Sequence, residues 1–255
     1  MAVKTTLKRL FKGTFVELAY RRLRSTLGVE APHEAMARAE DEAMKRIMGQ
    51  VLQKADTTVD VGCHMGEMLA EMVRLTPQGV HHAFEPIPGQ AAWLEKKFPG
   101  VRVHRLAASD AAGETTFFHN LDQPAYSGLK QQEVGGRVER IAVKTVPLDD
   151  VLASERAIRL VKIDVEGAEL RVLKGAAGVI RKHRPVVLFE YVKHASERFG
   201  DSDEAIYDYF DAEQGYDLYR VQGFFGGEGA LSVQAFKDCA KEFRSFNYVA
   251  LPRKP

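Results

Sequence analysis

The sequence predicts an α/β fold in which a mostly parallel sheet carries helices on both faces. Short apolar or β-branched runs alternate along the chain with helical patterns, which is typical of parallel sheets. A turn with two glycines joins one such strand to the helix after it, in the stretch Thr57–Leu69, T-T-V-D-V-G-C-H-M-G-E-M-L. Acidic residues follow several of the predicted strands, where open α/β sheets bind their ligands.

The composition of the 255 residues is that of a globular protein, with 45% hydrophobic and 28% charged residues. The net charge of +1 gives no overall attraction to nucleic acid or to membranes. The two cysteines, Cys63 and Cys239, form no disulfide framework. No apolar run approaches the roughly 20 residues of a membrane span. We therefore expect a cytoplasmic protein that does not bind nucleic acid; nothing in the sequence predicts its oligomeric state.

Residues 1–55 are predicted to form an N-terminal helical segment that precedes the α/β domain at residues 56–255. Apolar residues recur at roughly helical spacing from Leu7 to Leu18, among many lysines and arginines. This pattern fits a surface helix that contacts anionic lipid or a partner, and it also fits a helix packed on the main domain with a solvated charged face. A second helix is predicted at Glu34–Gln50.

The other elements follow from periodicity and from the glycine, proline and turn residues that bound them. Beyond Thr57–Leu69, strands are predicted at Val80–Phe84, Val101–Ala107, Glu114–His119, Val138–Thr145, Leu160–Ile163, Pro185–Phe189, Asp217–Val221 and Phe246–Leu251. Helices are predicted at Gln90–Phe98, Pro147–Ala153, Glu169–Ile180 and Asp203–Phe210. Residues 120–137 and Gly223–Gly229 are predicted to be loops.

The glycine turn predicts a nucleoside site without a phosphate, or else a plain tight turn. Gly62 permits a sharp turn, and Gly66 lets the backbone approach a ligand closely. The helix that follows offers unpaired N–H groups to polar or negative groups. A dinucleotide site needs G-x-G-x-x-G, and His64 stands where that pattern needs a glycine. The pattern therefore argues against pyrophosphate binding.

Two further strand ends offer polar groups. Glu85 could accept hydrogen bonds from both ribose hydroxyls, although it also fits a surface acid beside a proline turn. Ser109 and Asp110 follow the third strand, where an adenine would lie. Both residue types also favour ordinary turns.

The most informative motif is V-K-I-D-V-E-G-A-E-L-R-V-L-K-G-A at residues 161–176. Asp164 and Glu166 are two positions apart, so on an extended chain they face the same side. They could hold an ammonium group, a substrate hydroxyl or a metal, or they could be solvated loop acids. Glu169 falls in the first helical turn, where it complements the helix dipole.

Together, D-V-G-C-H-M-G, F-E-P-I-P, A-A-S-D-A-A-G-E and K-I-D-V-E-G-A-E-L-R-V-L-K-G-A resemble the FkbM family of S-adenosyl-L-methionine-dependent methyltransferases. The resemblance covers roughly Thr57–Tyr191. It implies a seven-stranded, Rossmann-like class I methyltransferase domain that methylates oxygen, often a hydroxyl of a sugar or natural product. Family members commonly carry Ala-Asn where this chain has Cys63-His64. His64 either donates a hydrogen bond to the cofactor or is structural.

The expected cofactor residues share a place at the turn or at the strand ends: Asp60, Gly62, His64, Gly66, Glu85, Ser109, Asp110 and Asp164. Asp60 is expected to organise the turn and the methionyl ammonium group. A hydroxyl acceptor also calls for a base, and the candidates are Glu166, Glu190 and His194. His194 has the most suitable unperturbed pKa, whereas burial could raise the pKa of Glu190.

No ligand spacing demands a metal, so none is predicted, although Asp164, Glu166 and Glu190 could supply oxygen ligands. Two other functions remain open: an NAD(P)-dependent oxidoreductase, which the missing glycine disfavours, and a non-catalytic cofactor-binding interaction protein, which the set of strand-end acids disfavours. The acceptor is expected to be a small molecule with a hydroxyl group. Residues 120–137, the segment after Glu190 and the loop at 223–229 are expected to shape its site.

Overall fold

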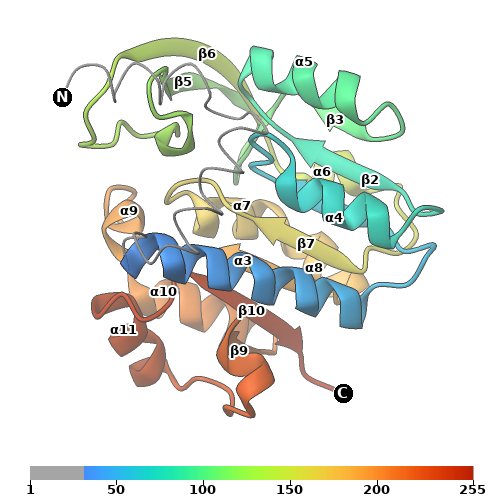
Figure 1. The fold of residues 1–255 in the computed structure, drawn as a ribbon, viewed down its shortest axis with the longest axis vertical. Coiled ribbons are helices and arrows are strands. Elements are labelled where there is room, and N and C mark those ends of the chain that lie inside the picture. The colour runs from blue at the N-terminus through green and yellow to red at the C-terminus, as the bar shows by residue number, and fades with distance from the viewer. Residues whose placement is uncertain (1–31, 255) are drawn as a thin grey trace.

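The computed structural model describes residues 32–254, so the predicted basic helix near the N-terminus lies outside the described residues. Its main sheet confirms the predicted fold class (Figure 1). The seven strands lie in the order β3 (Arg102–His104), β2 (His81–Phe84), β1 (Thr58–Val61), β7 (Leu160–Ile163), β8 (Val186–Glu190), β10 (Asn247–Pro252) and β9 (Tyr216–Arg220). Within the described residues, β10 alone runs opposite to the other six strands of this sheet. This is the mostly parallel, Rossmann-like sheet that the family resemblance implies.

Helices cover both faces of this sheet. One face carries α3 (Pro32–Val51), α4 (Glu67–Leu75) and α5 (Pro88–Lys97). The other carries α6 (Leu148–Leu152), α7 (Glu169–Gly175), α8 (Ala177–His183), α10 (Asp203–Asp208) and α11 (Val233–Lys241). Figure 1 shows α3 and α4 in front of the sheet and α7 and α8 behind it.

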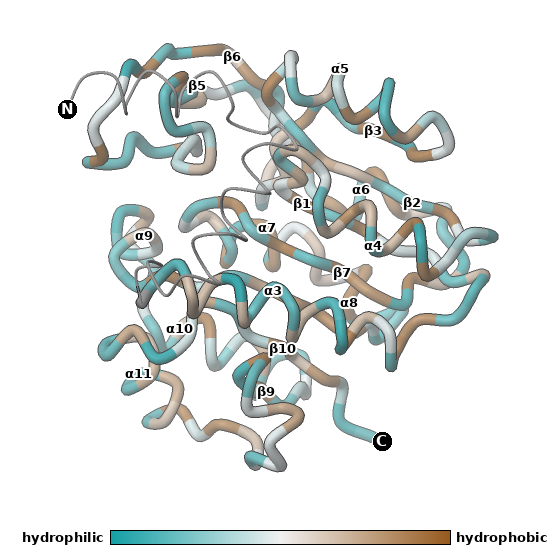
Figure 2. The backbone as a smooth tube through the Cα atoms, in the orientation of Figure 1, coloured by the Kyte–Doolittle hydropathy of each residue, from teal (hydrophilic) through white to brown (hydrophobic). Residues whose placement is uncertain are grey.

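Strand β8 shows how the sequence fills both cores. Val186 and Leu188 enter the cluster under α3 and α4, whereas Val187 and Phe189 enter the cluster under α7 and α8. Successive strand residues point to opposite faces, so a strand covered on both sides must be apolar throughout. Figure 2 shows this as hydrophobic colour along the central strands, whereas the outer helices mix both kinds of residue.

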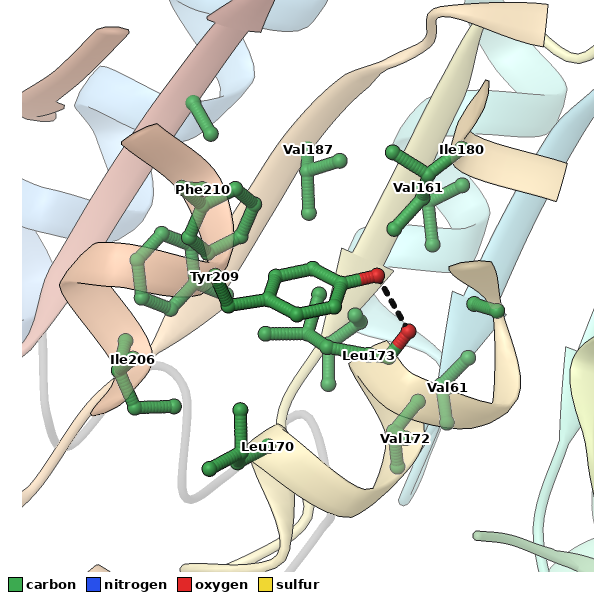
Figure 3. Packing of buried hydrophobic residues seen from close by; sticks show 14 of the residues in the cluster. Val61, Val161, Leu170, Val172, Leu173, Ile180, Val187, Ile206, Tyr209 and Phe210 are labelled. Atoms are coloured by element: carbon green, nitrogen blue, oxygen red, sulfur yellow. Dashed lines mark hydrogen bonds between the residues drawn. The ribbon is translucent and has the colours of Figure 1, made fainter. Parts of the chain in front are cut away.

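The larger core closes around a π-helical turn at Tyr209–Glu213, which continues from α10. Figure 3 shows Tyr209 and Phe210 packed against Leu170, Leu173 and the strands. The Tyr209 hydroxyl donates a hydrogen bond of 2.5 Å to the carbonyl oxygen of Leu173. A buried hydroxyl needs such a partner, and this bond ties the C-terminal helices to α7.

A second sheet of three strands includes the last residue of one predicted strand. It consists of β4 (Ala107–Ala108), β6 (Val138–Val146) and β5 (Gly113–Asn120). The prediction of one strand over Val101–Ala107 is therefore wrong, because β3 ends at His104 and Ala107 pairs with β6. The break lies at Arg105, whose exposed guanidinium binds Glu95 on the outside of α5.

The prediction of one helix over Glu169–Ile180 is also wrong, because α7 ends at Gly175 and α8 begins at Ala177. The carboxylate of Asp149 accepts hydrogen bonds from the N–H groups of Gly178 and Val179, at 2.8 and 2.7 Å. Those N–H groups lie in a first helical turn, which lacks backbone partners, so Asp149 stabilises the start of a new helix. The sequence reading also missed α9 (Lys193–Glu197) and α11, and the predicted Gly223–Gly229 loop contains a 3₁₀ turn at Gly223–Gly226.

Helix α3 confirms the predicted helix at Glu34–Gln50, and one buried carboxylate fixes it to the sheet. Glu40 is fully buried. It accepts hydrogen bonds from the hydroxyl of Ser245 at 2.5 Å, from the N–H groups of Phe246 and Asn247, and from the Asn247 side-chain amide at 3.1 Å. These donors lie at the start of β10. A charged acceptor with several donors forms strong hydrogen bonds, so this contact sets where α3 lies over the sheet.

The division at residue 55 stays a prediction, although α3 shares an apolar cluster with β7, β8 and β10. Among residues 32–254, no helix is both long and apolar enough to cross a membrane.

We predict that Glu40→Ala lowers the free energy of unfolding by about 3 kcal/mol, because it leaves buried N–H groups without an acceptor. The control is Glu42→Ala, which removes an exposed acid from the same helix and should change stability little. Urea unfolding of both variants measures the difference. Equal stabilities would contradict the structural role of Glu40.

Candidate functional site

A cavity of about 300 Å³ opens at the carboxyl ends of β1, β2, β7 and β8. This is the edge where open α/β sheets bind ligands. Helix α3, the turn after β1 and the segment after β2 line part of the cavity. The segment after β7, the last residue of β8 and the start of β10 line another part. The second sheet and the loop at 124–129 complete the walls. Of the predicted site residues, the cavity wall contains Gly62, His64, Glu85, Asp164, Glu166 and Glu190.

Gly62 allows the turn after β1 to pass close to the chain after β7. Its φ is +78°, and a Cβ atom there would lie 1.8 Å from the carbonyl oxygen of Asp164. Any other residue would force the two strand ends apart. Gly66 acts differently from the expectation, because it does not line the cavity. It begins α4 with a φ of +76° and packs against Leu94 and Phe98 of the α5 region.

A buried lysine joins these two strand ends. The ammonium group of Lys162 donates hydrogen bonds to the carbonyl oxygen of Gly62 at 3.1 Å and to the Asp164 carboxylate at 3.2 Å. It also lies 3.6 Å from Asp60 Oδ1. Burial alone would lower the pKa of Lys162, but the carboxylates of Asp164 and Asp60 outweigh it and raise that pKa. Lys162 therefore remains a cation at neutral pH.

Asp60 supports the turn from below rather than from the cavity wall. It is fully buried, and burial raises its pKa although Lys162 opposes the shift. The thiol of Cys63 donates a hydrogen bond to the backbone carbonyl oxygen of Asp60 at 3.1 Å. Sequence reasoning had not assigned Lys162 a role. The available signal was a lysine between Val161 and Ile163, inside a strand buried on both faces.

Glu85 is held by backbone donors on both sides. One oxygen accepts from the N–H of His64 at 3.0 Å and the other from the N–H of Ile87 at 2.9 Å. Burial raises the pKa of Glu85 to about 7, although these two hydrogen bonds oppose the shift. The carboxylate therefore lies fixed at the cavity wall, with oxygen lone pairs left over for hydroxyl donors.

His64 contributes its backbone to this contact. Its φ is +48°, in the left-handed region. Asparagine and histidine are both enriched there among non-glycine residues. The departure from the family's Ala-Asn therefore keeps the conformation that presents the N–H of residue 64 to Glu85.

The structure does not bring Ser109 and Asp110 to the cavity. The Ser109 hydroxyl donates to Asp110 at 3.0 Å, and Asp110 lies 3.7 Å from the guanidinium of Arg171. Leu106, Ala107 and Ala108 line the cavity instead. Because β3 ends early, the chain enters the second sheet at this point and presents apolar residues where polar ones were expected.

Three further carboxylates gather at the cavity wall. One oxygen each of Asp164, Glu166 and Glu190 lies within 4.8 Å of the other two. The predicted reason for this proximity is wrong, because Glu166 has a φ of +59° and belongs to a tight turn rather than an extended chain. The same three oxygens are suitable ligands for a divalent cation.

Burial raises the pKa values of both glutamates of this group, because a charged carboxylate is poorly solvated there. For Glu166 the pKa rises to about 8, with Asp164 adding to the shift and a hydrogen bond from Gln132 opposing it. That hydrogen bond, from Gln132 Nε2 to Glu166 Oε2, is 2.5 Å long. For Glu190 the pKa rises well above the usual value, and Asp164 and Glu166 add to the effect of burial.

Glu169 shapes the turn that carries these acids. Its carboxylate accepts hydrogen bonds from the N–H groups of Val165 and Gly167, both at 3.1 Å. Burial raises its pKa to about 7. This buried, loop-closing contact goes beyond the expected interaction with the helix dipole, and Glu169 does not line the cavity.

His194 is the one candidate base that the structure leaves outside. It is exposed on α9, its ring lies 6.4 Å from that of Phe243, and it does not line the cavity. The cavity residues that were not predicted include three from α3, Ala37, Asp41 and Met44. No strand-end pattern marks them, since they reach the cavity only through the packing of α3.

Comparison with known proteins adds a family match. The description "Methyltransferase FkbM domain" matches residues 60–218. The 2-O-methyltransferase NoeI of Sinorhizobium fredii is 25% identical over 211 residues, which cover 74% of this chain and 81% of NoeI. The methyltransferase sdnD of Sordaria araneosa is 33% identical over 156 residues, which cover 46% of this chain and 59% of sdnD.

Among solved structures, the FkbM methyltransferase of Methylobacillus flagellatus is similar with a TM-score of 0.46 and 17% identity. The match covers 78% of this chain and 44% of that one. The family match itself spans more than half of the chain and includes every acid at the cavity wall except Asp41. The chain therefore belongs to the FkbM methyltransferase family, and it is a methyltransferase.

Proposed function

We propose that this protein transfers a methyl group from S-adenosyl-L-methionine to a hydroxyl group of a small molecule, with a sugar as the favoured acceptor class. The observation that carries the proposal is the cavity's donor set. Carboxylates stand at the ends of β2, β7 and β8, next to a glycine turn that lacks the dinucleotide pattern. Such a set suits a cationic nucleoside without phosphate groups.

The residues present fit this cofactor along the length of the cavity. Glu85 would accept hydrogen bonds from the ribose hydroxyls. Ile87 and the segment Leu106–Ala108 would form an apolar wall for the adenine ring. Asp164, held by Lys162, would face the cationic end. When bound, S-adenosyl-L-methionine supplies a methyl group activated by a positively charged sulfur.

The protein's own part in the reaction is to align the acceptor and to remove its proton. Two neighbouring carboxyls with different pKa values divide such work. Burial, Asp164 and Glu166 raise the pKa of Glu190 well above the usual range, which favours the protonated form that can donate a hydrogen bond. Glu166 has a pKa of about 8 and is oriented by Gln132, so we assign it as the base. His194 has no place in this mechanism because it lies outside the cavity.

Two observations support a hydroxyl acceptor of small size. The relative NoeI is named as a 2-O-methyltransferase. Pro124, Ala125 and Ser127 of the predicted 120–137 loop line the same cavity as Glu166, together with Phe246 before β10. The family match removes the oxidoreductase alternative. Turnover on any hydroxyl acceptor would remove the interaction-protein alternative.

We predict that Glu85→Gln weakens binding of S-adenosylhomocysteine about 10-fold, because an amide replaces an ionic acceptor of ribose hydroxyls. The control is Glu95→Gln, an exposed acid that pairs with Arg105 and should leave the affinity unchanged. Isothermal titration calorimetry measures both, and the wild type should not bind NADH. Unchanged affinity in Glu85→Gln would exclude this carboxylate from the cofactor site.

We predict that Glu166→Gln lowers kcat at least about 100-fold, as expected for the loss of a general base, while S-adenosylhomocysteine still binds. The control is Glu133→Gln, which removes an exposed charge from the loop that carries Gln132. The assay is transfer of labelled methyl groups to sugar acceptors. Near-normal turnover would assign the base elsewhere.

The same assignment predicts a pH profile for the wild type. The rate should rise with pH as Glu166 loses its proton, with a midpoint at or below about 8 because a cationic cofactor lowers the raised pKa. The variant Glu166→Gln should lack this rise. An identical rise in the variant would show that another group titrates.

A chelation experiment distinguishes a mechanism in which one of the three carboxylates is the base from one in which they hold a metal ion. A direct base predicts that activity survives dialysis against EDTA. Loss of activity that magnesium restores would instead show that Asp164, Glu166 and Glu190 hold a divalent cation next to the acceptor.

A further inference from the structure

Helix α3 lies outside the family match at residues 60–218, yet it supplies part of the cavity wall. Among its cavity residues, Asp41 is the one with a charge. Within residues 32–254, no group of the protein hydrogen bonds to the Asp41 carboxylate or forms an ion pair with it. The adjacent Glu40, by contrast, is saturated with donors from the start of β10. The Glu40 contact therefore fixes the helix turn that places an unpaired carboxylate in the cavity.

The surroundings of Asp41 place it at one end of the cavity. Glu67 of the first α4 turn and Asp164 after β7 disfavour its negative charge, whereas Lys45 of α3 and Lys162 of β7 favour it. Burial is the largest influence, and these groups together raise the pKa of Asp41 to about 6. Asp164 and Lys162, which act on Asp41, also flank Gly62, and these three residues belong to the β1 and β7 ends. The Asp41 carboxylate is therefore assigned to the Gly62–Asp164 end of the cavity that it lines.

We infer that Asp41 binds the ammonium group of the cofactor's methionyl moiety, which makes α3 part of the cofactor site. This inference rests on the proposed function. The cofactor carries two cationic groups at this end, the sulfonium and the ammonium. The sulfonium must lie on the side of Glu166 and Glu190, where the methyl group leaves. The ammonium is left for the α3 side, where Asp41 offers an acceptor that no donor among residues 32–254 uses.

Comparing the binding of two ligands distinguishes the Asp41 contact from the other contacts of the site. S-adenosylhomocysteine carries the ammonium group, whereas methylthioadenosine has the same adenosine and thioether but no amino-acid moiety. We expect Asp41→Asn to weaken binding of S-adenosylhomocysteine about 10-fold, the loss typical of one ionic hydrogen bond. Binding of methylthioadenosine should not change. The control Glu42→Gln removes a negative charge from the same helix turn and should affect neither ligand.

The pH dependence gives a second readout. In the wild type, the affinity for S-adenosylhomocysteine relative to methylthioadenosine should rise as the pH increases through about 6, because Asp41 must lose its proton to bind a cation. The ratio cancels the titration of Glu85, which both ligands share. Asp41→Asn should lack the rise in this ratio, and Asp41→Glu should restore part of it. Calorimetry on the full chain measures all of these affinities, and circular dichroism checks that each variant remains folded.

Each outcome decides between the two proposals. If Asp41→Asn binds both ligands as tightly as the wild type does, the ammonium contact is overturned and the methyltransferase site stands. Equal weakening of both ligands also overturns it, because α3 would then act only by closing the cavity. Failure of the wild type to bind either ligand overturns the proposed function itself.

Discussion

The buried ammonium group of Lys162 is the contact on which the site depends. It lies between two strand ends, where it binds the carbonyl oxygen of Gly62 and the carboxylate of Asp164 and approaches Asp60. Breaking such a buried set by removing one partner costs about 3–5 kcal/mol, because the remaining charges stay in a poorly solvated place. The lysine therefore fixes the spacing of β1 and β7 at the edge where the cavity opens, and it does so with the charge that the surrounding acids require.

The single charge of Lys162 does not balance the acids around it, so the cavity has an excess of negative groups. Glu85, Glu166 and Glu190 all have pKa values raised first by burial, and Asp41 follows the same pattern. A site built this way favours a ligand that brings positive charge, since the ligand offsets the cost of ionising the acids. It also explains why carboxyls with different pKa values lie side by side. Glu190, next to Asp164 and Glu166, has its pKa raised well above the usual range, whereas Glu166, held by Gln132, has a pKa of about 8.

The sequence was most informative where local pattern and burial agree. Strands β7 and β8 are apolar except for Lys162 and the terminal Glu190, because both faces are covered, so their positions could be read to within one residue, together with the acids at their ends. Glu85, Asp164, Glu166 and Glu190 reached the cavity as their strand-end positions predicted.

Where the sequence predictions failed, the cause is a contact between residues that are distant in sequence or the packing of a helix. The Glu169–Ile180 pattern continues as one helix in sequence, but the carboxylate of Asp149, 29 residues before Gly178, starts a second helix. His194 follows a buried strand, yet α9 turns it to the surface. Asp41 reaches the cavity only because Glu40 fixes α3 on β10. The role of Lys162 was open to inference, since a lysine in a strand buried on both faces requires a buried anion nearby.

A crystal structure of the full chain with S-adenosylhomocysteine would test the proposed site in one measurement. We expect the ribose hydroxyls on Glu85, the sulfur toward Glu166 and Glu190, and the amino-acid moiety between the Gly62 turn and α3. A ligand bound elsewhere, or bound in this cavity with its sulfur directed away from those two glutamates, would contradict the site and the mechanism built on it.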